Sequence, residues 1–282
     1  MTRSSTTALS LSAEIRQRFD EFSRSQKDVG QYIVDHLEEA AFHTAEELAL
    51  RANTSSSTVV RFAQALGFEG FPELQAAARD EYRRGRENGA QPELAAPPLF
   101  PIDQTEFEAA LAADHANLEE TAHKVERDEW TAAIDLISRS ERIVLCGTDQ
   151  MAFFASYLRH LLMLLDLRCE VVASPSQEGL AKLGRIDAST VLVGFSAGRP
   201  HPLVVRAMKL ARNRRAATIA ISDATLSEVS KLSDHKLYYS SNSPAYVRSH
   251  AALLSLVQAL AYGIYALDES AYADRIRAFR LK

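Results

Sequence analysis

The chain has 282 residues, of which 46% are hydrophobic and 24% charged, so it is long enough for two globular domains with cores of their own. Its formal net charge of -5 argues against nonspecific binding to nucleic acid, but it leaves room for a small, locally basic surface. The two cysteines, Cys146 and Cys169, exclude a disulfide framework and a metal site of the spaced Cys/His kind. We therefore expect no metal and no cofactor.

Hydropathy argues against a membrane protein. The densest apolar stretches, residues 151–155 and 161–165, are far shorter than the roughly 18 to 20 residues that cross a bilayer. The N-terminal residues lack the continuous apolar core of a secretory signal. We therefore expect a cytoplasmic protein without membrane contact.

Residues 1–85 are predicted to be helical. Apolar residues recur there every three or four positions, as along one face of an amphipathic helix, and no strand pattern is visible. These residues are Leu11, Ile15, Phe19 and Phe22, followed by Val29, Ile33, Val34 and Leu37. Four of the nine prolines then fall within residues 86–105, which predicts a linker.

Residues 106–282 show a different pattern. Short apolar runs alternate with helical stretches, which predicts a five-stranded parallel sheet with helices on both faces. The runs are residues 142–146, 169–173, 190–195, 217–221 and 236–240. In such a sheet Cys146 ends one strand and Cys169 begins the next, so we expect the two thiols at opposite edges and unpaired. The predicted fold class is an all-α domain followed by an α/β domain.

Two short helices joined by a tight turn are predicted within residues 44–67. Thr44 is a good N-cap with Glu47 at the capping-box spacing, and this helix should end near Ala52. Ser55 should cap a second helix, which Gly67 ends. The buried face of the second helix is predicted to consist of Val59, Phe62, Ala63 and Leu66. Together the two helices form a helix-turn-helix.

The outward face of the second helix is typical of a surface that contacts DNA. Its first turns carry hydroxyl side chains, an arginine and a glutamine, which can hydrogen-bond phosphates or base edges. The free N–H groups and partial positive charge of a helix N-terminus also favour a phosphate. An alternative is that these residues only cap a solvated helix. The candidate DNA-binding residues are Ser55, Ser56, Ser57, Thr58, Arg61 and Gln64.

The run from Ser55 to Leu74 resembles the N-terminal domain of RpiR-type bacterial transcription regulators. The shared pattern is S-x-x-T-V-V-R-F-A-x-x-L-G-F-x-G-F-x-E-L. That family joins a helical DNA-binding domain to a sugar isomerase (SIS) domain, which senses a phosphorylated sugar rather than converting it. The resemblance implies a helix-turn-helix DNA-binding domain in residues 1–85, a linker in 86–105, and an SIS-like effector-sensing and dimerisation domain in 106–282.

Two loops carry the resemblance to SIS domains, which hold a sugar phosphate at the carboxyl ends of their strands. The first loop, commonly G-x-G-x-S, is here Gly147-Thr148-Asp149-Gln150-Met151, and the carboxylate of Asp149 disfavours a phosphate. The second, commonly S-x-S-G followed by a polar residue and Thr, runs here from Ser196 to His201, with one serine lost and Arg199 added. A guanidinium can clamp a phosphate or a carboxylate with two parallel hydrogen bonds.

These departures leave two interpretations of the second domain. In the first, it binds a small anion with Arg199 as the main anchor, assisted by Gln150 and Ser196 and by Ser249 or His250 from a partner subunit. The candidate effector-binding residues are Gly147, Thr148, Gln150, Ser196, Gly198, Arg199 and Ser249. In the second, the domain has lost its ligand and only dimerises. Ser196 is also expected to cap a helix that starts at Pro200.

An enzyme is the third possibility. Isomerisation of a sugar phosphate needs a base that moves a proton between adjacent carbons. Glu178 and His201 are conceivable bases, but the spacing indicates no pairing between them. We therefore expect no catalytic residues.

The sequence also predicts assembly. Helices over residues 107–123 and 246–267 carry apolar stripes that one sheet need not cover, and a dimer doubles the number of base pairs that a short recognition helix reads. We expect a homodimer or higher even oligomer that binds a double-stranded DNA operator. By its resemblance it would control carbohydrate or sugar-acid metabolism in response to a small anionic effector such as a sugar phosphate.

Overall fold

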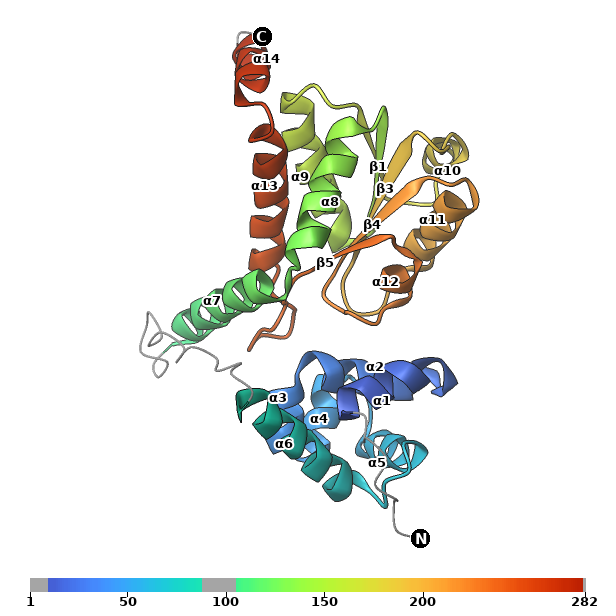
Figure 1. The fold of residues 1–282 in the computed structure, drawn as a ribbon, viewed down its shortest axis with the longest axis vertical. Coiled ribbons are helices and arrows are strands. Elements are labelled where there is room, and N and C mark those ends of the chain that lie inside the picture. Colours follow the sequence, from blue (N-terminus) through green and yellow to red (C-terminus); the bar gives the residue numbers. More distant parts are fainter. Residues whose placement is uncertain (1–9, 88–104, 281–282) are drawn as a thin grey trace. The chain divides into compact units, whose positions relative to one another are not determined.

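The computed structural model describes residues 10–87 and 105–280. The chain divides into two compact units, Met1–Pro97 and Pro98–Lys282, and each is described by itself. Residues 88–104, most of the predicted linker, lie outside the described residues. Figure 1 shows helices in the first unit and a sheet covered by helices on both sides in the second, which confirms the predicted fold class.

Over residues 10–87 the first unit is helical, as its apolar periodicity predicts. The helices are α1 (Leu11–Arg18), the short 3-10 helix η1 (Phe19–Glu21), α2 (Arg24–Asp35), α3 (Leu37–Phe42), α4 (Ala45–Arg51), α5 (Ser56–Ala65) and α6 (Phe71–Glu87). One boundary differs from the sequence pattern, because His36, with φ of -130° and ψ of 56°, is not helical. Leu37, which continues the repeat of Ile33, therefore begins a new helix.

The predicted helix-turn-helix is present in α4 and α5. The Thr44 hydroxyl accepts from the Glu47 N–H at 3.3 Å and the Glu47 carboxylate accepts from the Thr44 N–H at 2.8 Å, a reciprocal capping box. α5 begins after Ser55 and ends before Gly67. Gly67 has a φ of 90°, which glycine adopts without strain because it has no Cβ. The four inward residues, Val59, Phe62, Ala63 and Leu66, are at most 1% exposed.

The second unit is built on a five-stranded parallel sheet of order β2-β1-β3-β4-β5. Its strands are β1 (Arg142–Cys146), β2 (Cys169–Val172), β3 (Thr190–Ser196), β4 (Ala217–Ser222) and β5 (His235–Tyr238). Its helices are α7 (Glu106–Lys124), α8 (Arg127–Arg139), α9 (Gln150–Leu164), α10 (Gln177–Gly184), α11 (Pro202–Asn213), α12 (Glu228–Leu232), α13 (Ala251–Tyr265) and α14 (Glu269–Arg280). All five predicted strands are present.

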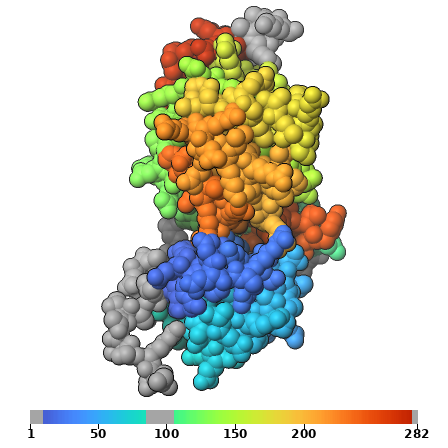
Figure 2. All heavy atoms as spheres, turned by 90° about the vertical axis from the view of Figure 1, so that its right-hand side faces the viewer, coloured from blue at the N-terminus to red at the C-terminus, as the bar shows by residue number. Residues whose placement is uncertain are grey.

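Both faces of the sheet are covered, which explains why the strands read as continuous apolar runs. On one face α8, α9 and α13 pack against side chains such as Leu145, Val193 and Ile221. On the other, α10, α11 and α12 pack against Val144, Leu192 and their neighbours. Figure 2 looks onto this second face, where the yellow and orange segments form the surface.

The two cysteines lie at opposite edges of the sheet, as predicted. Cys146 pairs in register with Val172, at the end of β2, whereas Cys169 pairs with Ile143 near the start of β1. Both thiols are free and buried. Burial raises the pKa of Cys146 to about 12 and that of Cys169 to about 11, so both stay protonated at neutral pH.

Two local predictions for this unit are wrong. The last long apolar helix begins at Ala251 rather than near residue 246, because residues 239–250 form the loop that follows β5. The helix after β3 begins at Pro202, and its cap is His201, whose Nδ1 accepts from the Leu203 N–H at 3.1 Å. Ser196 does not cap it.

Within the described ranges, no single helix is long and apolar enough to span a bilayer. Only α13 together with residues Glu269–Arg277, which are bent by 109° relative to it, passes such a test by length and composition.

Candidate DNA-binding helix and effector site

The predicted DNA-binding residues run along α5, with the four hydroxyl residues at its N-terminus and Gln64 near its C-terminal end. The Ser55 hydroxyl accepts from the Thr58 N–H at 3.3 Å and lies 2.9 Å from the hydroxyls of both Ser57 and Thr58. Ser57, Arg61 and Gln64 are exposed, while Ser56 and Thr58 are half-buried. The first turn of α5 therefore presents a hydroxyl cluster at its surface.

Arg61 folds back toward this cluster. Its Nε donates to the Ser57 carbonyl at 3.1 Å, and its Nη2 donates to the Ser57 hydroxyl at 3.3 Å. These bonds are exposed, so a phosphate or base edge can replace them at little cost. The only cation in this face of α5 thus sits beside the helix N-terminus, where the helix dipole also attracts anions.

Two residues that sequence analysis did not single out hydrogen-bond backbone carbonyls of α5. Gln26 in α2 donates from Nε2 to the Arg61 carbonyl at 3.3 Å. Arg18 donates from Nη2 to the Ala65 carbonyl in the last turn of α5 at 2.8 Å. They act on backbone atoms far away in sequence, so neither spacing nor residue type signals them.

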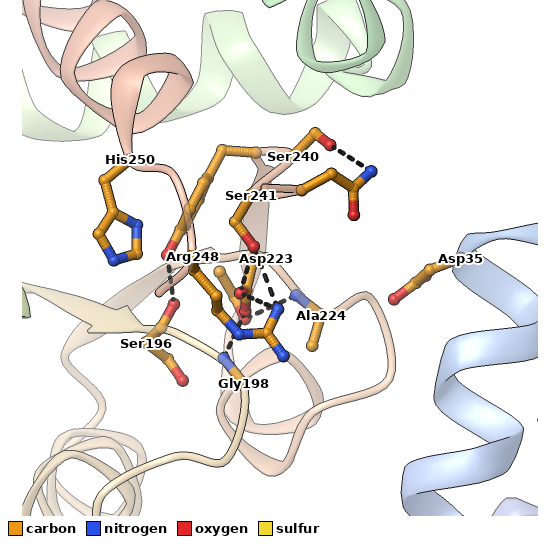
Figure 3. Close-up of polar contacts among 12 residues, drawn as sticks. Asp35, Ser196, Gly198, Asp223, Ala224, Ser240, Ser241, Arg248 and His250 are labelled. Atoms are coloured by element: carbon orange, nitrogen blue, oxygen red, sulfur yellow. Dashed lines mark hydrogen bonds and ion pairs between the residues drawn. The ribbon is translucent and has the colours of Figure 1, made fainter. Parts of the chain in front are cut away.

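In the second unit, side chains converge where the parallel strands end, and Asp223 is at their centre (Figure 3). Asp223 directly follows β4, and its side chain is 1% exposed. Its Oδ1 accepts from the Gly198 N–H at 2.6 Å. Its Oδ2 accepts from the Ser241 hydroxyl at 2.8 Å and from Arg248 Nη1 at 3.0 Å. The carboxylate is therefore buried but fully hydrogen-bonded.

Two buried polar atoms at the same edge have no hydrogen-bond partner among the described residues. They are the hydroxyl of Ser196, the last residue of β3, and Nδ1 of His250. The other nitrogen of His250, Nε2, lies 3.0 Å from Gln150 Oε1. Because an amide oxygen only accepts, Nε2 carries the proton and Nδ1 is left as an acceptor. Burial lowers the pKa of His250, so the ring is neutral at neutral pH.

Tyr239 also lies at this edge of the sheet. It is fully buried, and its hydroxyl donates to the Ser196 carbonyl at 3.1 Å. Burial raises its pKa well above the usual value, with the nearby Asp223 carboxylate as the next cause. Tyr239 is therefore a neutral donor that holds the end of β3 in place.

The structure brings some of the predicted effector residues together. Gln150 contacts His250, and Gly198 contacts Asp223, across sequence separations of 100 and 25 residues. Gly147 is needed for packing, because a Cβ there would lie 2.7 Å from the Met151 carbonyl oxygen. Thr148 is buried, and Arg199 is exposed on the loop after β3.

Ser249 and His250 need no partner subunit to reach this edge. The Ser249 hydroxyl donates to the Asp114 carboxylate in α7 of the same chain. His250 likewise contacts Gln150 of its own chain. The expectation that Ser249 or His250 comes from a partner subunit stays a prediction, because these contacts all lie within one chain.

Sequence reasoning missed Asp223, Ser241 and Arg248. Arg248 stands in the loop that was expected to be helical, and Asp223 lies outside both loops of the SIS pattern. The position of Asp223 directly after a buried apolar strand was the available signal, because the carboxyl ends of parallel strands share one edge.

The loop after β5 is also tied to α7 by buried polar side chains. Asn117 donates from Nδ2 to the Asn242 carbonyl at 2.7 Å, and its Oδ1 accepts from the Asn242 N–H at 2.9 Å. The Ser240 hydroxyl lies 2.8 Å from the same Oδ1, and the Ser240 N–H donates to the Thr121 hydroxyl at 2.9 Å. These bonds fix the position of the loop relative to α7.

Comparison with known sequences agrees with this two-part architecture. The profile of the helix-turn-helix domain of the rpiR family matches residues 9–85, and the SIS domain profile matches residues 136–263. Among curated proteins, the chain is 22% identical to the uncharacterized HTH-type transcriptional regulator YbbH of Bacillus subtilis over 263 residues, which are 90% of this chain and 91% of YbbH.

Solved structures show the same fold. The sugar isomerase domain of an RpiR transcription factor from Sphaerobacter thermophilus is 22% identical with a TM-score of 0.59, covering 61% of this chain and 97% of that one. The NanR protein of Vibrio vulnificus, solved in complex with ManNAc-6P, is 18% identical with a TM-score of 0.57, covering 96% of both chains. The chain therefore belongs to the RpiR family of helix-turn-helix transcriptional regulators and carries an SIS domain in its C-terminal half.

Proposed function

We propose that this regulator binds a double-stranded DNA operator through the N-terminal half of α5 and senses a small anionic effector at the carboxyl edge of its sheet. The observation that carries the effector site is the pair of buried, unpartnered atoms, Ser196 Oγ and His250 Nδ1, near the half-exposed guanidinium of Arg248. Buried polar atoms are normally hydrogen-bonded, and two unpartnered ones at the same strand-end edge, beside a partly exposed cation, support a ligand that supplies the missing bonds.

The metabolic role follows from the fold and the relatives. NanR shares this fold and was solved with a phosphorylated sugar, which supports a sugar-derived effector and control of carbohydrate or sugar-acid metabolism. In the rival interpretation the SIS domain only dimerises, and ligand screening separates the two.

Sensing without turnover is supported by the positions of the two conceivable bases. Glu178 is fully exposed and paired with Lys182 at 2.6 Å, and the hydrogen bond from Lys182 lowers its pKa, which weakens it as a base. His201 uses Nδ1 to cap α11. Interconversion of sugar phosphates by the purified protein would contradict a purely sensory role.

A homodimer remains our prediction for the assembly. An open apolar groove of about 400 Å³ lies between α7, α8 and α13, the two predicted interface helices and their neighbour. Leu118, Trp130 and Leu256 are among the residues that line it. A second copy would cover this apolar surface and would also supply the second recognition helix.

Arg61→Ala should weaken specific operator binding by about 1 to 3 kcal/mol per half-site, because it removes the cation beside the hydroxyl cluster. The fold should be unaffected, since Arg61 is exposed, its side chain bonds to Ser57, and alanine keeps the carbonyl that accepts from Gln26. Fluorescence anisotropy with operator DNA at fixed salt measures the loss, and circular dichroism checks the fold. Arg16→Ala, which removes an exposed arginine from α1, is the charge-matched control. Equal affinities for both variants would remove Arg61 from the interface.

An effector should raise the stability of the second unit. A ligand that binds only the folded state adds about 2.7 kcal/mol at a hundredfold excess over its dissociation constant. Thermal shift with a panel of sugar phosphates and sugar acids measures this, and each compound that shifts the transition is then tested for an effect on operator binding. If no compound shifts the transition, the dimerisation-only interpretation replaces the sensing one.

A further inference from the structure

The carboxyl edge of the sheet already contains an anion, the carboxylate of Asp223. Its oxygens are held by a backbone N–H at Gly198, a hydroxyl at Ser241 and the guanidinium of Arg248. These are the three kinds of donor that proteins use to hold a bound phosphate or carboxylate. Gly198 has φ of 55° and so points its N–H in a direction that regular strand structure does not allow.

Arg248 is only partly used by this anion. Among the described residues its Nη1 donates to Asp223 and Ser241, whereas Nε and Nη2 have no partner, and 53% of the side chain is exposed. The guanidinium lies against Gly198, where a Cβ would come within 3.4 Å of Nη2. The free Nε–Nη2 edge is a planar fork that matches a carboxylate in two parallel hydrogen bonds.

The charges around this fork are balanced before any ligand binds. The loops at the carboxyl ends of the strands carry two carboxylates, Asp149 and Asp223, and two guanidinium groups, Arg199 and Arg248. His250 is neutral because burial lowers its pKa. A phosphate ester brings close to two negative charges at neutral pH, and a carboxylate brings one. Because Asp223 already neutralises Arg248, the net attraction at the outer edge is weak for either anion, whereas taking a phosphate dianion out of water costs more than taking out a carboxylate monoanion.

We propose that Asp223 is a built-in counter-anion, which makes this site prefer a sugar acid to a phosphate ester. The sugar acid binds through its carboxylate to the Nε–Nη2 edge of Arg248. His250 Nδ1 accepts from a hydroxyl of the same ligand. The ligand class rests on the effector role proposed above, whereas the exclusion of phosphate by Asp223 stands without it.

Asp223→Asn tests the counter-anion directly with inorganic phosphate as the probe. The asparagine oxygen still accepts from the Gly198 N–H, but the negative charge is gone. The affinity of the full chain for phosphate should rise by about tenfold or more, because a like charge a few ångströms away changes an equilibrium constant by about that factor. A ³¹P NMR titration, with chloride at equal ionic strength as the reference, measures this affinity. The unmutated chain should show no binding specific for phosphate.

Second substitutions in the Asp223→Asn background identify the anchor. Arg248→Gln should abolish the gained phosphate binding, and Arg199→Gln, the matched control in the neighbouring loop, should leave it. Loss with Arg199→Gln instead would overturn the assignment of Arg248. Equal phosphate affinities of the unmutated chain and Asp223→Asn would overturn the role of Asp223 as a counter-anion. If Asp223→Asn does not fold, Asp223→Ser, which also removes the charge and keeps a smaller polar side chain, serves in its place.

The ligand class has its own measurement. Gluconate, glucuronate and galacturonate are compared with glucose 6-phosphate by thermal shift on the unmutated chain and on Arg248→Gln. A sugar acid should shift the unmutated chain alone, and a larger shift by the phosphate ester, or none by any acid, would overturn the sugar-acid assignment. The effector role itself is tested separately. It is contradicted if no compound changes operator binding, and this result does not depend on the phosphate titrations.

Discussion

Phe62→Ala is expected to destabilise the N-terminal unit by about 3 to 5 kcal/mol, the usual range for truncating a buried phenylalanine. The side chain is 0% exposed, and its ring meets that of Phe22 edge to face at 4.9 Å between centroids. It also packs directly on the backbone of Gly30, where a Cβ would lie 3.1 Å from the ring. Small domains have only about 5 to 15 kcal/mol of stability in total, so much of the unit should unfold at moderate temperature.

Calorimetry of the full chain measures this effect. The two units have separate cores, so the transition of the N-terminal unit should move to lower temperature while that of the α/β unit stays in place. Specific DNA binding should be lost together with the first transition. Phe42→Ala is the matched control, because Phe42 belongs to the same unit but is 61% exposed, and its loss should cost less than about 1 kcal/mol. Equal effects of the two substitutions would show that Phe62 does not anchor this core.

Asn117→Ala should destabilise the α/β unit by about 3 kcal/mol. Asn117 is 1% exposed, and its amide is the partner of both backbone groups of Asn242 and of the Ser240 hydroxyl. Alanine would leave the N–H and the carbonyl of Asn242 without this partner in a partly buried place, and each such group costs about 1 to 3 kcal/mol, whereas the Ser240 hydroxyl keeps the Glu120 carboxylate. Chemical denaturation followed by tryptophan fluorescence measures the loss, since Trp130 belongs to the same unit.

The loop released by Asn117→Ala is the one that carries Ser241 and Arg248. Effector affinity should therefore fall as well, even though Asn117 makes no contact with Asp223 or Arg248. Asn213→Ala is the control, because Asn213 is exposed at the end of α11. A variant with lowered stability but unchanged ligand affinity would show that α7 supports the fold without positioning the site.

Much of the local structure could be read from the sequence. Thr44 with Glu47, Ser55 and Gly67 mark the ends of α4 and α5, because caps depend on residues within one helical turn. The five apolar runs became five strands for the same reason, since hydrophobic periodicity reflects burial along a short segment. The candidate DNA-binding residues lie within one short helix, so their grouping was also visible.

The candidate effector site depended on the tertiary structure. Asp223, Ser241 and Arg248 lie in separate loops, and Asn117 is 125 residues from Asn242. The sequence reading chose Arg199 as the anion anchor because Arg199 stands inside the loop of the SIS pattern, and it extended α13 over the loop that carries Arg248. Capping signals and periodicity act over a few residues, whereas the meeting of these side chains is set by the parallel register of β3, β4 and β5, which brings their carboxyl ends to one edge. The sequence by itself thus determined the helix-turn-helix, the strands and the division into two domains, and only the folded sheet decided which charges face each other at its edge.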